Sequence, residues 1–108
     1  MRKVYVNENM TVEIGCNGEN NATALCFPVI EKWKLLYGNE GTYTIKLRKP
    51  KGASSYSKET FTDEFNAYCI LSAEDLAESG IGKAMVMYTD GTTVAKSVIY
   101  NVKISESL

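Results

Sequence analysis

Three cysteines are the most reactive side chains in a chain that contains no histidine. A catalytic thiolate at Cys16, Cys26 or Cys69 would need a neighbouring base or cation, and histidine is the usual base. Cys26 and Cys69 also lie in apolar runs, where a thiol normally packs. We therefore expect three reduced, mostly buried thiols, with no disulfide and no catalytic cysteine.

Metal and phosphate chemistry are also poorly supported. The cysteines are 10 and 43 residues apart, without a Cys-x-x-Cys pair, so they do not match a zinc site. The segment Gly80-Ile81-Gly82-Lys83 resembles the end of a phosphate-binding loop. The full pattern needs glycine at 77 and serine or threonine at 84, and the chain has alanine at both. We predict no metal ligand, no cofactor and no cofactor-binding residue.

Two acidic pairs, Asp63-Glu64 and Glu74-Asp75, are the remaining candidates for acid–base chemistry. Adjacent carboxylates rarely converge on one substrate as the paired acids of glycosidases do. Glu74-Asp75 also suits the first turn of a helix, whose dipole favours negative charge. The sequence therefore predicts no catalytic residue, and we expect that the protein is not an enzyme.

Charge is balanced overall but unevenly distributed. The chain has 12 lysines and arginines and 13 acidic residues, a net charge of −1. Residues 31–58 hold seven cations and two anions, whereas residues 59–78 hold six anions and no cation. The low net charge argues against nucleic-acid and acidic-membrane partners. The two segments are predicted to pair within the domain or between copies, while the basic run 46–51 also fits a solvated strand face.

Alternation of apolar and polar residues, which is typical of strands, dominates the segments that would position these groups. The turn-forming pair Asp90-Gly91 predicts a hairpin, and the long second arm of that hairpin predicts a bulge or sheet switch near Lys96. One short helix is expected near residues 72–79, with Ser72 as its N-cap and Gly80 as its stop. The predicted strands cover residues 10–16, 23–30, 33–37, 43–48, 56–61, 65–71, 83–88 and 94–104.

The fold class predicted from this pattern is mainly β, an antiparallel immunoglobulin-like β-sandwich of about seven to nine strands. We expect residues 1–108 to form a single domain. Cys16, Trp33 and Cys69 follow the order of the disulfide and tryptophan of antibody domains, and we expect Trp33 to anchor the core without that disulfide. No apolar run approaches the roughly 18–20 residues that span a membrane.

Four stretches resemble a known family, in their order along the chain: Trp33–Gly38, Tyr43–Pro50, Ala73–Gly82 and Lys96–Val98. They resemble the N-terminal immunoglobulin-like domain of upper baseplate proteins of siphophages and prophages. The resemblance implies a non-enzymatic structural module of a phage or prophage tail. It also implies contacts with other tail or baseplate proteins, homo-oligomers in the assembly, and a place in the virion tail after synthesis in the bacterial cytoplasm. The low net charge and the lack of a membrane-spanning run predict no nucleic-acid or membrane partner.

The alternative is a carbohydrate-binding or adhesion β-sandwich module with a glycan partner. Seven tyrosines and one tryptophan could supply stacking platforms for sugars. Against this, Trp33, Tyr37 and Tyr43 share their parity with aliphatic residues, which predicts that they are buried. An exposed planar row of aromatic rings would favour the alternative.

Overall fold

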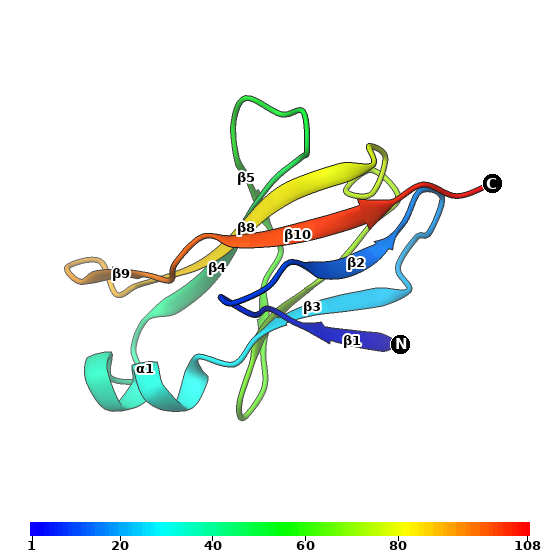
Figure 1. Cartoon of the computed structure of the whole chain (residues 1–108). Coiled ribbons are helices and arrows are strands. Elements are labelled where there is room, and N and C mark those ends of the chain that lie inside the picture. Colours follow the sequence, from blue (N-terminus) through cyan, green and yellow to red (C-terminus); the bar gives the residue numbers. More distant parts are fainter.

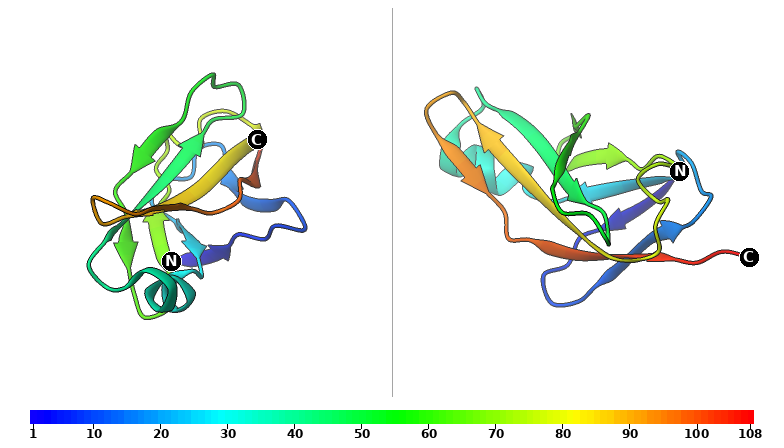
Figure 2. Two further views of the ribbon diagram at one scale, coloured as in Figure 1. Left: turned by 90° about the vertical axis from the view of Figure 1, so that its left-hand side faces the viewer. Right: turned by 90° about the horizontal axis from the view of Figure 1, so that it is seen from above.

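Two β-sheets pack face to face in the computed structural model, which describes all 108 residues (Figures 1 and 2). The four-stranded sheet has the order β1 (Arg2–Tyr5), β3 (Thr23–Phe27), β7 (Ala67–Ile70), β6 (Phe61–Thr62). The six-stranded sheet has the order β2 (Val12–Cys16), β10 (Tyr100–Ser105), β8 (Gly80–Thr89), β4 (Thr42–Arg48), β5 (Tyr56–Lys58), and β9 (Val94–Lys96) also pairs with β8.

The predicted β-sandwich is confirmed, with differences in detail. The chain has ten strands rather than seven to nine. Two pairings are parallel, β1 with β3 and β2 with β10, so both sheets are mixed rather than antiparallel. Strand β1 was not predicted, because its residues are mostly exposed and carry no clear alternation.

Alternation along the strands builds the core between the sheets. On β8, Ala84, Val86 and Tyr88 are buried while the residues between them are partly exposed. The other inward side chains come from both sheets and share the same contiguous cluster, which includes Leu25, Phe27, Cys69, Ile45, Leu47, Val102 and Ile104. The side chains at the alternate positions of these strands therefore face outward from both sheets.

The helix lies elsewhere than the sequence predicted. Residues 33–37, expected as a strand, belong to α1 (Ile30–Tyr37). The spacing of their apolar residues fits the strand period of two as well as the helix period of about 3.6. Ile30 and Trp33 are three residues apart and both buried, which places them on one face of a helix. Gly38 ends it with a φ of 91° and donates its amide hydrogen to the Lys34 carbonyl at 2.9 Å. Trp33 is buried as expected, but on a helix.

The helix predicted near residues 72–79 is wrong. This segment forms turns, although Ser72 caps it as foreseen by accepting the Asp75 amide hydrogen at 3.2 Å. Its backbone makes only two helix-like bonds, from Leu76 to Ser72 and from Ala77 to Glu74. The isolated turn is too short to propagate as a helix, and at Gly80, with a φ of 126°, the chain enters β8.

The predicted hairpin and its bulge are confirmed. Thr89 pairs with Val94, so the loop spans residues 90–93 rather than the two residues expected, and Asp90 caps it by accepting the Thr92 and Thr93 amide hydrogens. Further along, Met87 pairs with Lys96 but Ala84 pairs with Tyr100. One extra residue on the second arm therefore makes a bulge at residues 97–99.

The bulge changes the face of the sheet on which the side chains after it lie. Ala95 is buried before it, and Val102 and Ile104 are buried after it, although their parities differ. Ser97 stabilises the bulge, because its hydroxyl accepts the Val86 amide hydrogen at 3.0 Å and donates to the Val98 carbonyl at 2.8 Å. No helix in the structure has the length and apolar character needed to cross a membrane.

Candidate interaction surface

The cysteines take up packing positions. Cys26 and Cys69 are buried, Cys16 is half-buried, and all three are free. Burial raises the pKa of Cys69 to about 12, and burial likewise raises the pKa of Cys26. A thiol that stays protonated is a poor nucleophile. No group of three or more cysteine, aspartate or glutamate side chains lies together in a way that could hold a metal ion.

The glycines of the segment Gly80–Lys83 serve strand packing. Residues 80–83 begin β8, and Gly82 lies so close to β4 that an added Cβ would be 2.7 Å from the Arg48 carbonyl oxygen. Strands of this kind use glycine where another backbone approaches closely. The resemblance to a phosphate-binding loop therefore has a structural explanation.

Asp75, from the second acidic pair, is the centre of a buried polar cluster. Its carboxylate lies 2.6 Å from the Lys58 Nζ and accepts the Tyr56 hydroxyl at 2.7 Å. It also accepts the Ser72 amide hydrogen at 2.8 Å. The turn after β7 supplies Asp75 and Ser72, while β5 supplies Tyr56 and Lys58, so the cluster joins the two sheets.

The charges in this cluster are matched. Burial by itself raises the pKa of Asp75, but the hydrogen bonds from Lys58, the Ser72 amide and Tyr56 outweigh it and hold the pKa below its usual value. Nearby, Glu74 lies 3.9 Å from Lys49. The basic segment 31–58 and the acidic segment 59–78 thus pair within the domain at two points, one of the two arrangements that the sequence left open.

The aromatic residues divide into a buried group and an exposed row. Trp33 stacks on Tyr43, with ring centroids 6.1 Å apart, and meets the Tyr37 ring edge-on. Tyr88 packs against both tyrosines and donates its hydroxyl to the Tyr37 carbonyl at 3.1 Å. Trp33 and Tyr88 are buried and Tyr43 is half-buried, whereas Tyr37 is 37% exposed and departs from the prediction.

The exposed row crosses the outer face of the four-stranded sheet. Register places Tyr5 beside Cys26, Cys26 beside Tyr68, and Tyr68 beside Phe61. The Phe61 and Tyr68 rings stack on each other at 5.6 Å. These two rings therefore face each other, whereas a sugar-stacking platform presents the face of the ring to its ligand.

The outer face of the six-stranded sheet is basic. Glu13 is the only carboxylate in its six strands, against six cations. Of the cations, only Lys58 belongs to one of the three ion pairs of the structure. We call the outward-facing side chains Lys46, Arg48, Lys83 and Lys103, with Met85 and Ile99 between them, the basic face.

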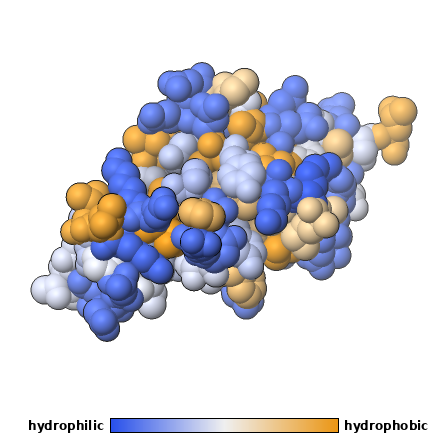
Figure 3. Space-filling view, turned by 90° about the horizontal axis from the view of Figure 1, so that it is seen from below, coloured by the Kyte–Doolittle hydropathy of each residue, from blue (hydrophilic) through white to orange (hydrophobic).

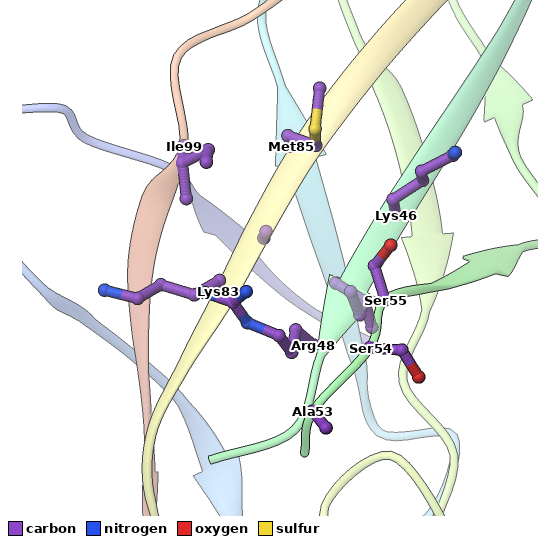
Figure 4. Close-up of a pocket in the computed structure, with 10 residues that line it drawn as sticks. Lys46, Arg48, Ala53, Ser54, Ser55, Lys83, Met85 and Ile99 are labelled. Carbon is purple, nitrogen blue, oxygen red and sulfur yellow. The ribbon is translucent and has the colours of Figure 1, made fainter. Parts of the chain in front are cut away.

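A hollow of about 390 Å³ lies within the basic face (Figure 4). Lys46 and Arg48 from β4 and Lys83 and Met85 from β8 line it, with Ile99 on the β10 side. The β4–β5 loop closes the other side with Ala53, Ser54 and Ser55. Leu47 and Ala84, which belong to the core, also contribute to its lining. The hollow therefore combines apolar side chains with the cations Lys46, Arg48 and Lys83 on the strand side and two serines on the loop side.

Sequence reasoning found only part of this face. The run 46–51 was singled out for its charge, but Lys83 and Lys103 were not grouped with it. Alternation along β8 and β10 was the available signal, because residues 83 and 103 have the parity opposite to the buried Ala84, Val102 and Ile104. Joining them to Lys46 and Arg48 required the order of the strands, which the local pattern does not contain.

Comparison with solved structures supports the fold. No protein-family model and no curated protein matches the sequence. Among solved structures, the chain is similar to one described as the N-terminal domain of phage TP901-1 ORF48, with a TM-score of 0.57 and 12% sequence identity. The match covers 97% of this chain and 99% of that chain. At this identity the likeness concerns the fold alone, and the two β-rich folds correspond over nearly their whole length.

Proposed function

We propose that this chain is a non-enzymatic structural module of a phage or prophage tail, similar to an upper baseplate protein, which binds other tail proteins. The observation that carries the proposal is the fold likeness to a phage protein domain over 97% of the chain. It agrees with the family resemblance of the four sequence stretches. In this proposal residues 1–108 act as one domain, located in the virion tail and assembled as a homo-oligomer.

The chemistry of the surface supports an assembly role. The buried carboxylate Asp75 and the buried thiols serve the fold, so they are not available for catalysis. The basic face combines unpaired cations with Met85 and Ile99. Protein interfaces commonly combine an apolar centre with a polar rim, and this face carries no aromatic ring for stacking nucleic-acid bases.

The test is the composition of purified particles. Phage particles induced from a host that carries the coding sequence should contain this chain in a fixed ratio to the other tail proteins, measured by quantitative mass spectrometry. Immunogold labelling should place it on the tail. A chain that is abundant in the lysate but absent from purified particles would contradict the proposal.

The carbohydrate-binding alternative rests on the exposed row of Tyr5, Tyr68 and Phe61. A glycan array tests it directly with the wild-type chain and the Tyr68→Ala variant. Binding that the Y68A variant loses would favour the alternative. We favour the tail module, because the buried aromatic group and the mutual stacking of Phe61 and Tyr68 leave few ring faces free.

A further inference from the structure

Phe65 is an exposed aromatic side chain that the fold does not explain. It lies in the turn of residues 63–66 between β6 and β7 and is 51% exposed, more than any other aromatic residue of the chain. Unlike Phe61, it packs against no other aromatic ring. Aromatic side chains, including Phe, are enriched in the buried centres of protein interfaces.

The backbone that carries Phe65 is fixed. Asp63 accepts the Phe65 and Asn66 amide hydrogens at 2.9 and 2.8 Å, and the Phe65 carbonyl accepts the Ile30 amide hydrogen of α1 at 3.3 Å. The turn therefore holds the Phe65 backbone in one position, and little backbone entropy would be lost on binding.

Carboxylates flank this ring along the chain, and Lys32 and Lys34 of α1 lie beside one of them, Glu64. Asp63 and Glu64 precede Phe65 directly, and Glu59 lies just before β6. Glu59 and Glu64 are exposed and belong to no ion pair. We call Glu59, Asp63, Glu64 and Phe65 the acidic edge. It combines an apolar knob with carboxylates, whereas the hollow in the basic face combines an apolar interior with Lys46, Arg48 and Lys83.

The turn that carries Phe65 and the hollow lie at opposite sides of the molecule. In Figure 1 the turn of residues 63–66 lies beside α1 at the bottom of the view, and the β4–β5 loop that borders the hollow lies at the top. Figure 3 shows hydrophobic side chains gathered among hydrophilic ones on the underside, towards the end where α1 lies. One copy can therefore use both surfaces at once, each with a different neighbour.

We propose that copies of this chain associate head to tail, with Phe65 of one copy in the hollow of the next and with Glu59 and Glu64 facing its Lys46, Arg48 and Lys83. The contact is heterologous, because a knob on one side of the molecule meets a pocket on the other, and such contacts build rings or filaments. This inference deepens the proposed function by naming the surfaces of self-assembly.

Sedimentation velocity of the full chain at low salt tests this contact. The wild type should associate as its concentration rises from about 10 μM to about 1 mM, and Phe65→Ala should weaken the association at least about tenfold. Met10→Ala is the matched control, since Met10 is 61% exposed in the loop between β1 and β2 and lies outside both surfaces. Raising the salt concentration should weaken association, because exposed charges are screened.

Several results would overturn the proposal. The wild type could remain monomeric over the whole range, or F65A could associate as strongly as the wild type and M10A. Circular dichroism of F65A shows that a loss of association does not come from unfolding. A monomeric chain that is nevertheless present in tail particles would overturn this inference alone, whereas absence from particles would contradict the proposed function.

Discussion

The Asp75 cluster and the basic face draw on the same charged segments but use them differently. In the cluster, Lys58 and Asp75 are 2.6 Å apart and largely buried, with Tyr56 and Ser72 completing the hydrogen bonds. On the basic face, Lys46 is half-buried and Arg48 is exposed, and neither forms an ion pair. The sequence shows a basic segment followed by an acidic segment. In the fold, Lys58 and Asp75 from these segments join the two sheets, whereas the cations of the basic face form no ion pair.

The burial of each region predicts what its charges contribute. A buried pair is costly to break, because removing one partner leaves the other charge desolvated and uncompensated. Exposed charges contribute little to stability, but they steer and orient partners. Substitutions in the cluster should therefore change folding, and substitutions on the basic face should change association.

The largest effect is expected for Lys58→Met. This change leaves the Asp75 carboxylate buried without its cation and should lower the free energy of unfolding by about 3–5 kcal/mol. Urea denaturation followed by circular dichroism measures it. The control is Lys46→Met, which should change stability by no more than about 0.5 kcal/mol. Equal losses in both variants would remove the distinction between the two regions.

The pH dependence of stability sharpens the same distinction. The pKa of Asp75 is lowered in the fold, so its stabilising effect is complete above the usual aspartate pKa, about 3.9. It is lost as the pH falls from there through the lower pKa of the folded state. Asp75→Asn should therefore flatten the acid limb of a stability–pH curve. Glu19, Asp63 and Asp90, whose pKa values are also lowered, should retain part of that limb.

An unchanged acid limb in D75N would mean that Asp75 does not titrate with folding. The matched comparison is Glu64→Gln on the acidic edge. The Glu64 side chain is exposed and accepts no hydrogen bond in the structure, so this variant should keep the wild-type stability at neutral pH.

A smaller effect is expected at the bulge of residues 97–99, which turns the Lys103 side chain outward. Ser97→Ala removes the hydroxyl that accepts the Val86 amide hydrogen and should cost about 1 kcal/mol. Thermal unfolding measures the loss, with Ser57→Ala on β5 as the control because the Ser57 side chain makes no hydrogen bond. A neutral S97A would show that the bulge forms without its hydroxyl.

The smallest effect on stability is expected on the basic face. The double reversal Lys46→Glu and Lys83→Glu should change the free energy of unfolding by less than about 1 kcal/mol, because both side chains lie on the surface. The hydrogen bond that Lys83 donates to Asn101 is exposed, and its loss is included in this range. A strongly destabilised variant would assign the basic face a role in folding.

Local pattern predicted much of the fold but not its surfaces. The hairpin, the bulge near Lys96 and strand β4 followed from turn chemistry and strict alternation. Residues 30–37 did not, because over eight residues the spacing of Trp33 and Tyr37 fits a strand as well as a helix. The basic face was out of reach for another reason: Lys46 and Arg48 join it through the pairing of β4 with β8, which no local signal specifies.

The most direct test of this account is a mixing experiment. The variant K46E/K83E has an acidic hollow and an acidic edge, and the variant E59K/E64K has a basic hollow and a basic edge, so each should be monomeric alone. An equimolar mixture should associate, because each hollow then meets an edge of opposite charge, and sedimentation velocity at low salt will show a faster boundary. A mixture that sediments as two monomers would contradict the claim that these surfaces bind each other.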